Sequence, residues 1–177
     1  MWGYDLPRSP PAPIRPVQPP PAAAPRRPTP PEPECIFPLF TRGGPSRQKA
    51  FDWDYDPDVG ESGAVVIRTK TRTDLCPLPE LVEILHSLFE RFGYTFFPLA
   101  NNVAKMPKGT ERNGLGMTIF NQPKSSATHA QAASYLGVVF EDLGLAKWNK
   151  KHRGIQWRLV RPPPTDVESL KGLWSGG

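Results

Sequence analysis

The strongest pattern of apolar and polar positions lies in residues 78–92. Apolar side chains recur there at three- and four-residue spacing, prolines stand at 77 and 79, and Gly93 follows. This spacing places the apolar side chains on one face of a helix, proline suits a first helical turn, and glycine is typical of a helix end. The sequence therefore predicts an amphipathic helix that starts between Asp74 and residue 79 and stops at Gly93.

A second helix is predicted from about Thr128 to Leu143. Its apolar side chains fall on one side, a proline and two serines in residues 123–126 precede it, and Gly144 follows it. Serine favours the N-cap of a helix because its hydroxyl accepts a hydrogen bond from a free backbone N–H group.

Shorter runs rich in β-branched and aromatic residues predict strands. The predicted strands cover residues 63–71, 94–99 and 114–121, and a final two-stranded ribbon runs from Trp148 to residue 160. A polar, basic segment between the second and third strands is expected to be an exposed loop.

The resulting order is β-α-β-β-α-β, which is the split arrangement of the ferredoxin-like fold. Each predicted helix has a single apolar stripe, so both would pack on one face of an antiparallel sheet. The sequence therefore predicts an α+β domain with a ferredoxin-like sheet.

The alternative fold is a winged helix. The helix that ends at residues 143–145 and the basic hairpin after it resemble the last helix and the wing of that family. Residues 131–138 also resemble the first half of a helix-turn-helix. However, Glu141 and Asp142 would then belong to a recognition helix, where DNA phosphates would repel them.

The first 48 residues differ in composition from the rest of the chain. Of the 24 prolines, 15 precede position 46. A segment with so few large apolar side chains cannot offset the entropy of ordering. We therefore expect a disordered arm in residues 1–48, the α+β domain in residues 49–161, and a tail in residues 162–177 with a possible short helix.

Two spacings in the arm suit the three-residue repeat that SH3-type and WW-type domains recognise. One is arginine-x-x-proline-x-x-proline and the other is its reverse, proline-x-x-proline-x-arginine. Residues that fit them are Arg27, Pro30 and Pro33, and Pro10, Pro13 and Arg15. The alternative is that the arm is a solvated spacer.

Residues 51–58 alternate aromatic and acidic side chains. In an extended segment this alternation places the rings on one side and the carboxylates on the other. The positions of Pro57 and Gly63 exclude a calcium-binding EF-hand loop. The segment is expected to cap the domain or to bind a partner.

Charge is distributed unevenly along the domain, although the net charge of the chain is only +5. Residues 50–104 carry nine acidic and four basic side chains, whereas residues 105–161 carry three acidic and ten basic ones. Such an asymmetry favours a polyanionic partner.

Clustered lysine and arginine side chains are what nucleic-acid phosphates require. Alternation along the last strand should bury Trp157 and expose Arg158. We therefore predict a non-catalytic nucleic-acid-binding module, with RNA favoured over DNA. The candidate phosphate-binding residues are Lys105, Lys108, Arg112, Lys147, Lys150, Lys151, Arg153 and Arg158.

No motif for catalysis, for a metal or for a cofactor is recognised. The histidines at 86, 129 and 152 have no second ligand at the usual spacing, and Cys76 precedes Pro77 with no evident base. The sequence therefore indicates no cofactor and no enzyme. The remaining alternatives are a subunit of a ribonucleoprotein or viral particle, an enzyme with an unrecognised site, and a basic hairpin that is merely solvated.

The sequence also bears on the compartment. No basic region leads into a short apolar run near Met1, and no stretch approaches the length of about 18 apolar residues that a membrane span needs. There are only two cysteines. We therefore expect an intracellular protein of the nucleus or cytoplasm, with no membrane partner and an unassigned oligomeric state.

Overall fold

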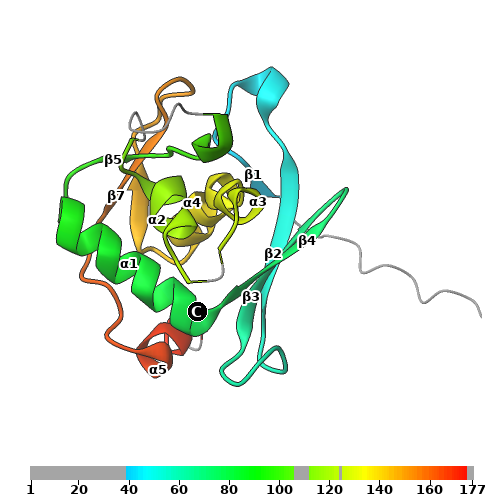
Figure 1. Cartoon of the computed structure of the whole chain (residues 1–177), viewed down its shortest axis with the longest axis vertical. Coiled ribbons are helices and arrows are strands. Elements are labelled where there is room, and N and C mark those ends of the chain that lie inside the picture. The colour runs from blue at the N-terminus through cyan, green and yellow to red at the C-terminus, as the bar shows by residue number, and fades with distance from the viewer. Residues whose placement is uncertain (1–38, 106–111, 124, 175–177) are drawn as a thin grey trace, which may run out of the picture. The chain divides into compact units, whose positions relative to one another are not determined.

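The computed structural model describes residues 39–105, 112–123 and 125–174 (Figure 1). These residues form an α+β fold with a four-stranded antiparallel sheet, a three-stranded sheet and five α-helices. The α+β class is therefore confirmed. The docking residues predicted in the arm, from Pro10 to Pro33, lie outside the described residues.

The first sheet is a simple antiparallel meander with the strand order β1-β2-β3-β4. Its strands are β1 (Leu39–Phe40), β2 (Ala50–Asp56), β3 (Ala64–Thr69) and β4 (Thr73–Pro77). The alternation predicted for β2 is confirmed at Phe51, which is 3% exposed in the core, and at Trp53 and Tyr55, which pack against the core edge.

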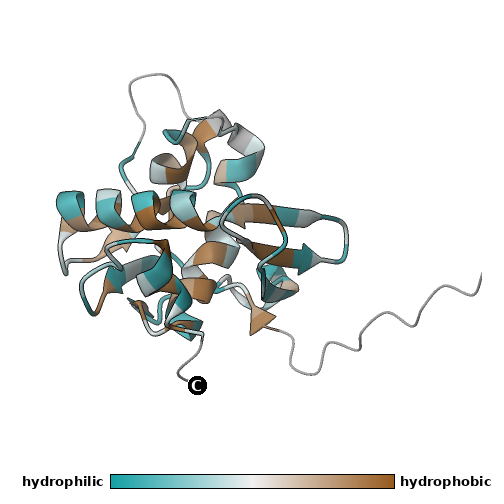
Figure 2. Cartoon of the chain, turned by 90° about the horizontal axis from the view of Figure 1, so that it is seen from below, coloured by the Kyte–Doolittle hydropathy of each residue, from teal (hydrophilic) through white to brown (hydrophobic). Residues whose placement is uncertain are grey.

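Helix α1 (Leu78–Phe92) follows β4 directly. Its apolar face is buried, and Figure 2 shows the hydrophobic residues along one side of the helix. Gly93 ends it with a φ of 54°, a left-handed conformation that glycine adopts without strain. The predicted helix is confirmed, but Asp74 belongs to β4 and the N-cap is Pro77.

The second sheet has the order β5-β7-β6, with both pairs antiparallel. Its strands are β5 (Phe97–Pro98), β6 (Ala146–Trp148) and β7 (Gln156–Leu159). Trp157 of β7 is fully buried and Arg158 is exposed, as the alternation predicts.

The second predicted helix is divided into α3 (Ala127–Ala130) and α4 (Ala133–Asp142). The Ser126 hydroxyl caps α3 by accepting a hydrogen bond from the His129 N–H group. Helix α4 lies against the buried Trp157 ring, and a Cβ at Gly137 would come within 2.6 Å of that ring. Glycine is required there because the helix and the indole are in direct contact.

The prediction of a strand at residues 114–121 was wrong, because this segment is helix α2 (Leu115–Phe120). Leu115 and Ile119, one turn apart, are both fully buried. Gly116 lets the first turn approach the preceding loop, since a Cβ there would lie 2.4 Å from the Ala100 carbonyl oxygen. Packing on one helical face therefore outweighs the β-propensity of the segment.

The loss of that strand also changes the topology. The seven strands of the described residues divide into two sheets, so the single ferredoxin-like sheet is not confirmed. Helices α2 and α4 lie between the two sheets (Figure 1), and one hydrophobic core includes residues from both sheets and from α1.

Short elements complete the fold. They are the 3-10 helices η1 (Pro45–Arg47) and η2 (Val103–Lys105), and helix α5 (Val167–Lys171). Helix α5 packs against α1 through Leu170, which is 1% exposed. After α5, Trp174 stacks on Tyr55 with ring centroids 5.0 Å apart.

Candidate nucleic-acid interface

A cleft of about 970 Å³ opens between η1, the loop after β5 and the start of β7. Arg47, Arg112 and Arg153 line it together with His152, and its described lining includes no aspartate or glutamate. Its walls are formed by residues 44–47, 98–102, 112 and 152–155. Three arginine residues thus line one open space.

A second hollow of about 560 Å³ shares Asn101 and Asn102 with the cleft. Lys49, Arg72 and Lys105 line it, and again the described lining carries no acidic side chain. We call the two hollows together the basic groove. Its cationic side chains are Arg47, Lys49, Arg72, Lys105, Arg112 and Arg153.

One cation of the groove has an acidic partner. The Nε atom of Arg72 lies 2.8 Å from a carboxylate oxygen of Asp74. Tyr135 also lines the second hollow, and burial raises the pKa of its phenol. At neutral pH it is therefore a neutral hydrogen-bonding group beside the cations.

The tip of the β6–β7 hairpin is held by the side chain of Asn149. Its amide nitrogen donates to the Gly154 carbonyl oxygen at 3.0 Å, and its oxygen accepts from the Lys151 N–H group at 3.1 Å. Lys150 and Gly154 adopt left-handed φ angles of 59° and 65°. The exposed Lys150, Lys151 and Arg153 are therefore presented by a hydrogen-bonded turn.

Glu141 joins the hairpin to the segment that follows β1. One of its carboxylate oxygens lies 2.8 Å from Nε of Arg42 and accepts a hydrogen bond from the indole N–H of Trp157 at 3.3 Å. The Arg42 guanidinium also lies 5.3 Å from the centre of the Trp148 ring. A single carboxylate therefore holds three elements together at the base of the hairpin.

Asp142 has a similar partner on the first sheet. Its carboxylate accepts a hydrogen bond of 3.0 Å from the indole N–H of Trp53. Sequence reasoning treated Glu141 and Asp142 as side chains that would repel phosphates. In the structure both are bonded within the protein, and seven of the ten residues of α4 are buried.

The structure separates the predicted phosphate-binding residues into three places. Lys105, Arg112 and Arg153 line the groove, and Lys150 and Lys151 stand at the hairpin tip. Lys147 and Arg158 lie opposite each other on β6 and β7, are exposed, and line neither hollow. Lys108 lies outside the described residues.

Sequence reasoning missed three cations of the groove. Arg47 fell in the predicted arm and Lys49 at the first position of the predicted domain, and neither of them nor Arg72 was among the candidate residues. The signal was the run of basic residues that starts at Arg42, where the density of prolines falls. Pairing of β1 with β2 places this run beside the groove.

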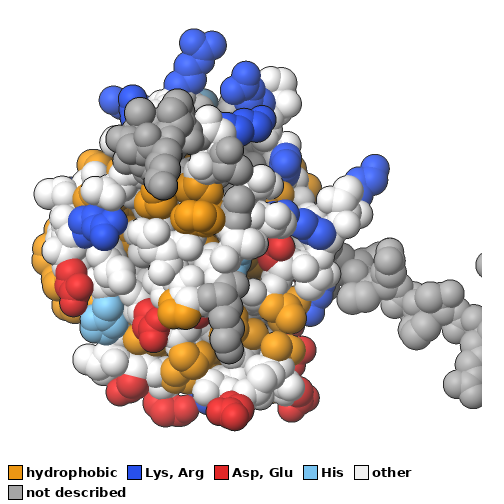
Figure 3. Space-filling view, viewed as in Figure 1, with side chains coloured by type: hydrophobic (Ala, Val, Ile, Leu, Met, Phe, Trp, Pro, Cys, Tyr) orange, Lys and Arg blue, Asp and Glu red, His pale blue; other side chains and the backbone are white. Residues whose placement is uncertain are grey.

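The charge asymmetry of the sequence is also visible in space. Figure 3 shows lysine and arginine side chains gathered at the end of the molecule where the β6–β7 hairpin and the segment after β1 lie. Acidic side chains gather at the opposite end, near α5 and the β2–β3 turn. The basic groove belongs to the positive end.

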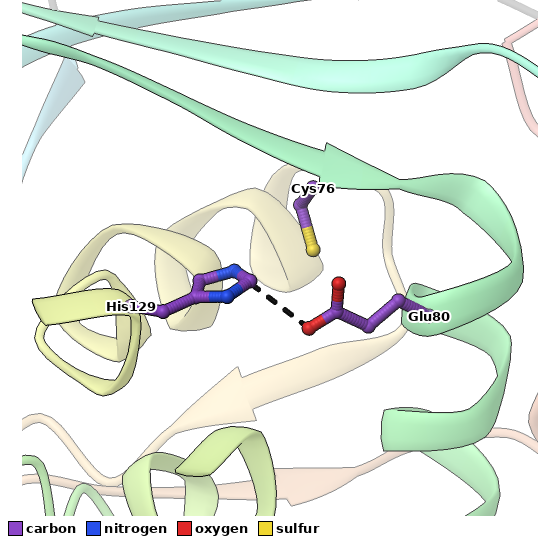
Figure 4. Close-up of side chains that lie close together, drawn as sticks. All are labelled: Cys76, Glu80 and His129. Atoms are coloured by element: carbon purple, nitrogen blue, oxygen red, sulfur yellow. Dashed lines mark ion pairs between the residues drawn. The ribbon is translucent and has the colours of Figure 1, made fainter. Parts of the chain in front are cut away.

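A different cluster of polar groups lies in the interior. Cys76, Glu80 and His129 place their sulfur, carboxylate and imidazole atoms within 4.8 Å of one another (Figure 4). Burial raises the pKa of the Cys76 thiol, and burial likewise raises the pKa of Glu80, against the effect of His129, which lowers it. Without a metal, Cys76 is a neutral thiol and a poor nucleophile.

Searches among protein-family models, curated proteins and solved structures found no match to this chain. Among the helices of the described residues, none combines the length and apolar character needed to cross a bilayer. Function must therefore be argued from the site and its chemistry.

Proposed function

We propose that this chain is a nucleic-acid-binding module that contacts phosphates with its basic groove and hairpin tip. The observation that carries the proposal is that Arg47, Arg112 and Arg153 line one cleft whose described lining has no acidic residue. Gathered cations repel one another, and a phosphate backbone relieves this repulsion. The proposed role is binding without catalysis.

The geometry of the groove favours a ligand that carries several phosphates. Cations line both hollows, and the two hollows adjoin at Asn101 and Asn102. Their amide groups can donate to phosphate oxygens or pair with base edges. A single small anion would satisfy only part of this surface, whereas a nucleic-acid strand can follow it.

Residues 78–159 support a winged-helix arrangement, in which the β6–β7 hairpin is the wing. Their order is α1, β5, α2, α3, α4, β6, β7, with β7 in the middle of the sheet. In a helix-turn-helix protein the recognition helix enters the major groove of DNA. Here α4 is covered by the rest of the protein, so we propose that the tip of the wing and the basic groove make the contacts.

The test is fluorescence anisotropy of the full chain with labelled single-stranded RNA, single-stranded DNA and duplex DNA over a salt series. The groove variant is Arg112→Glu/Arg153→Glu. The matched control is Lys147→Glu/Arg158→Glu, which changes net charge equally on a surface that lines neither hollow. Competition with polyglutamate tests whether any polyanion displaces the labelled nucleic acid.

We expect wild-type affinity to fall steeply with salt, because each phosphate contact releases counterions. Losing two arginine contacts and adding two repulsive charges should weaken binding by about 30-fold or more, whereas the control should change it by about threefold or less. Equal losses in the two variants would place the interface elsewhere. Absence of binding to all three ligands at low salt would refute the function.

A further inference from the structure

Three side chains of metal-ligand type meet where the first sheet, α1 and α3 join. Cys76 lies near the end of β4, Glu80 in the first turn of α1, and His129 in α3. Figure 4 shows their functional groups pointing toward one another. All three ligand atoms lie within 4.8 Å of one another, and among the described residues this is the one such group of three.

Two atoms of this cluster lack the partners that buried polar atoms normally have. Oε1 of Glu80 and Nε2 of His129 are closed off from solvent and accept or donate no hydrogen bond within the described residues. They lie 3.7 Å apart, which is an ion-pair distance but too long for a hydrogen bond. Buried polar groups without partners destabilise a fold, so this arrangement calls for a further group between them.

The distance between Glu80 and His129 is close to what a tetrahedral zinc ion requires. Zinc binds nitrogen and oxygen at about 2.0–2.1 Å and sulfur at about 2.3 Å, which separates ligand atoms by about 3.3–3.6 Å. The 3.7 Å between Glu80 and His129 is close to this separation. Because the three ligand atoms lie within 4.8 Å of one another, an inward movement of the side chains would bring Cys76 to the same separation.

The donor set also selects the metal. A thiolate, an imidazole and a carboxylate together favour zinc, whereas magnesium and calcium prefer oxygen ligands alone. We propose that Cys76, Glu80 and His129 bind one zinc ion, with water as the fourth ligand. Binding converts the thiol to a thiolate and releases its proton to solvent.

The consequence of such a site is mainly structural. It would fasten α3 to β4 and to the start of α1, which are 49 to 53 residues earlier in the chain. Gln131, just after α3, lines the second hollow of the basic groove. The zinc site is nevertheless independent of the proposed function, because a structural metal is compatible with any ligand or with none.

The test titrates the reduced, full-length chain with cobalt(II), an optical substitute for zinc. Coordination by a thiolate gives a charge-transfer absorption that saturates at one cobalt per chain and is displaced by zinc. Cys76→Ser should abolish this absorption, while Cys35→Ser, which removes the only other cysteine in the chain, should leave it unchanged.

Two conservative variants keep the test decisive if Cys76→Ser does not fold. Glu80→Gln and His129→Gln should each weaken cobalt affinity by at least about tenfold, since even the loss of an outer-shell partner has that effect. Zinc should raise the melting temperature of the wild type more than that of either variant, because a ligand of the folded state stabilises it. The matched control His86→Gln should respond to zinc like the wild type.

The proposal would be overturned by a folded wild type that shows no thiolate absorption with cobalt. It would equally be overturned if the absorption persisted in Cys76→Ser or disappeared in Cys35→Ser. The proposal would also be contradicted if Glu80→Gln and His129→Gln kept wild-type cobalt affinity. Cys76 would then be the only protein ligand, and the three-residue site would not exist.

Discussion

Two sets of charged side chains lie close to the β6–β7 hairpin, and they differ in whether they have acidic partners among the described residues. In the first set, Arg42 and Glu141 pair at 2.8 Å and are 31% and 20% exposed. In the second set, Arg47, Arg112 and Arg153 face an open cleft with no acidic residue in its described lining.

This difference separates the charges that hold the fold from those available to a ligand. A partly buried carboxylate with two donors stabilises the structure, and removing it leaves both donors unsatisfied. Exposed cations without partners contribute little to stability, and their mutual repulsion opposes folding. Each set can therefore be altered separately, which leads to four predictions, ordered by their expected effect on the free energy of unfolding.

The largest effect is expected for Glu141→Ala. This variant leaves the Arg42 guanidinium and the Trp157 indole N–H without their acceptor. The free energy of unfolding should fall by about 2–3 kcal/mol. Urea denaturation followed by tryptophan fluorescence measures it. Glu141→Gln, which keeps an acceptor oxygen but loses the charge, should lose about half as much; equal losses in the two variants would show that the charge is the whole effect.

A smaller effect is expected for Trp53→Phe, which removes the exposed hydrogen bond to Asp142 and keeps most of the aromatic surface. The loss should be about 0.5–1 kcal/mol, the usual contribution of one hydrogen bond. A double-mutant cycle with Asp142→Ala isolates the pair, because the second substitution should cost less when Trp53 is already replaced. Full additivity would mean that this bond contributes nothing.

The exposed, hydrogen-bonded carboxylate of Asp166 should have a smaller, pH-dependent effect on stability. Hydrogen bonds from Ser169 lower the pKa of Asp166 below its ordinary value of 3.8. The carboxylate therefore stabilises the folded state above pH 3.8, and this contribution is lost as the pH falls through the folded-state pKa. Asp166→Asn should melt slightly below the wild type at pH 7, and the two melting temperatures should converge as the pH falls below the lowered pKa of Asp166. A difference that persists at low pH would assign the effect to something other than charge.

The smallest effect on stability is expected for the groove variant Arg112→Glu/Arg153→Glu. Because no acidic partner in the described residues is lost at the cleft, the free energy of unfolding should change by no more than about 0.5 kcal/mol. Urea denaturation in parallel with Glu141→Ala provides the comparison. A loss as large as that of Glu141→Ala would show that the groove arginines are structural.

The sequence was informative where a signal is local. The apolar spacing of α1, the stop at Gly93 and the alternation at Trp157 and Arg158 all depend on nearby residues, and all three were predicted. Helix α2 was missed because its β-branched and aromatic residues imitate a strand. The contact that decides its structure, between Gly116 and Ala100, is formed only in the fold.

The candidate sites depend on contacts between distant parts of the chain. Arg42 and Glu141 are 99 residues apart, and no local pattern indicates that the acid would be paired. His129 is likewise remote in sequence from Cys76 and Glu80, so no ligand spacing was recognisable. The positive charge of residues 105–161 was predicted, but its concentration in a groove together with Arg47 and Lys49 follows from strand pairing.

The most direct test of phosphate binding by the groove is amide chemical-shift mapping of the isotope-labelled full chain during titration with single-stranded RNA. The predicted result is that the amides of Gly44, Ser46 and Arg47 and of residues 99–102 and 152–155 shift most, that the shifts diminish as salt is added, and that amides of residues 52–54 on β2 do not move. Shifts confined to β2, or spread evenly over the surface, would contradict the proposed interface.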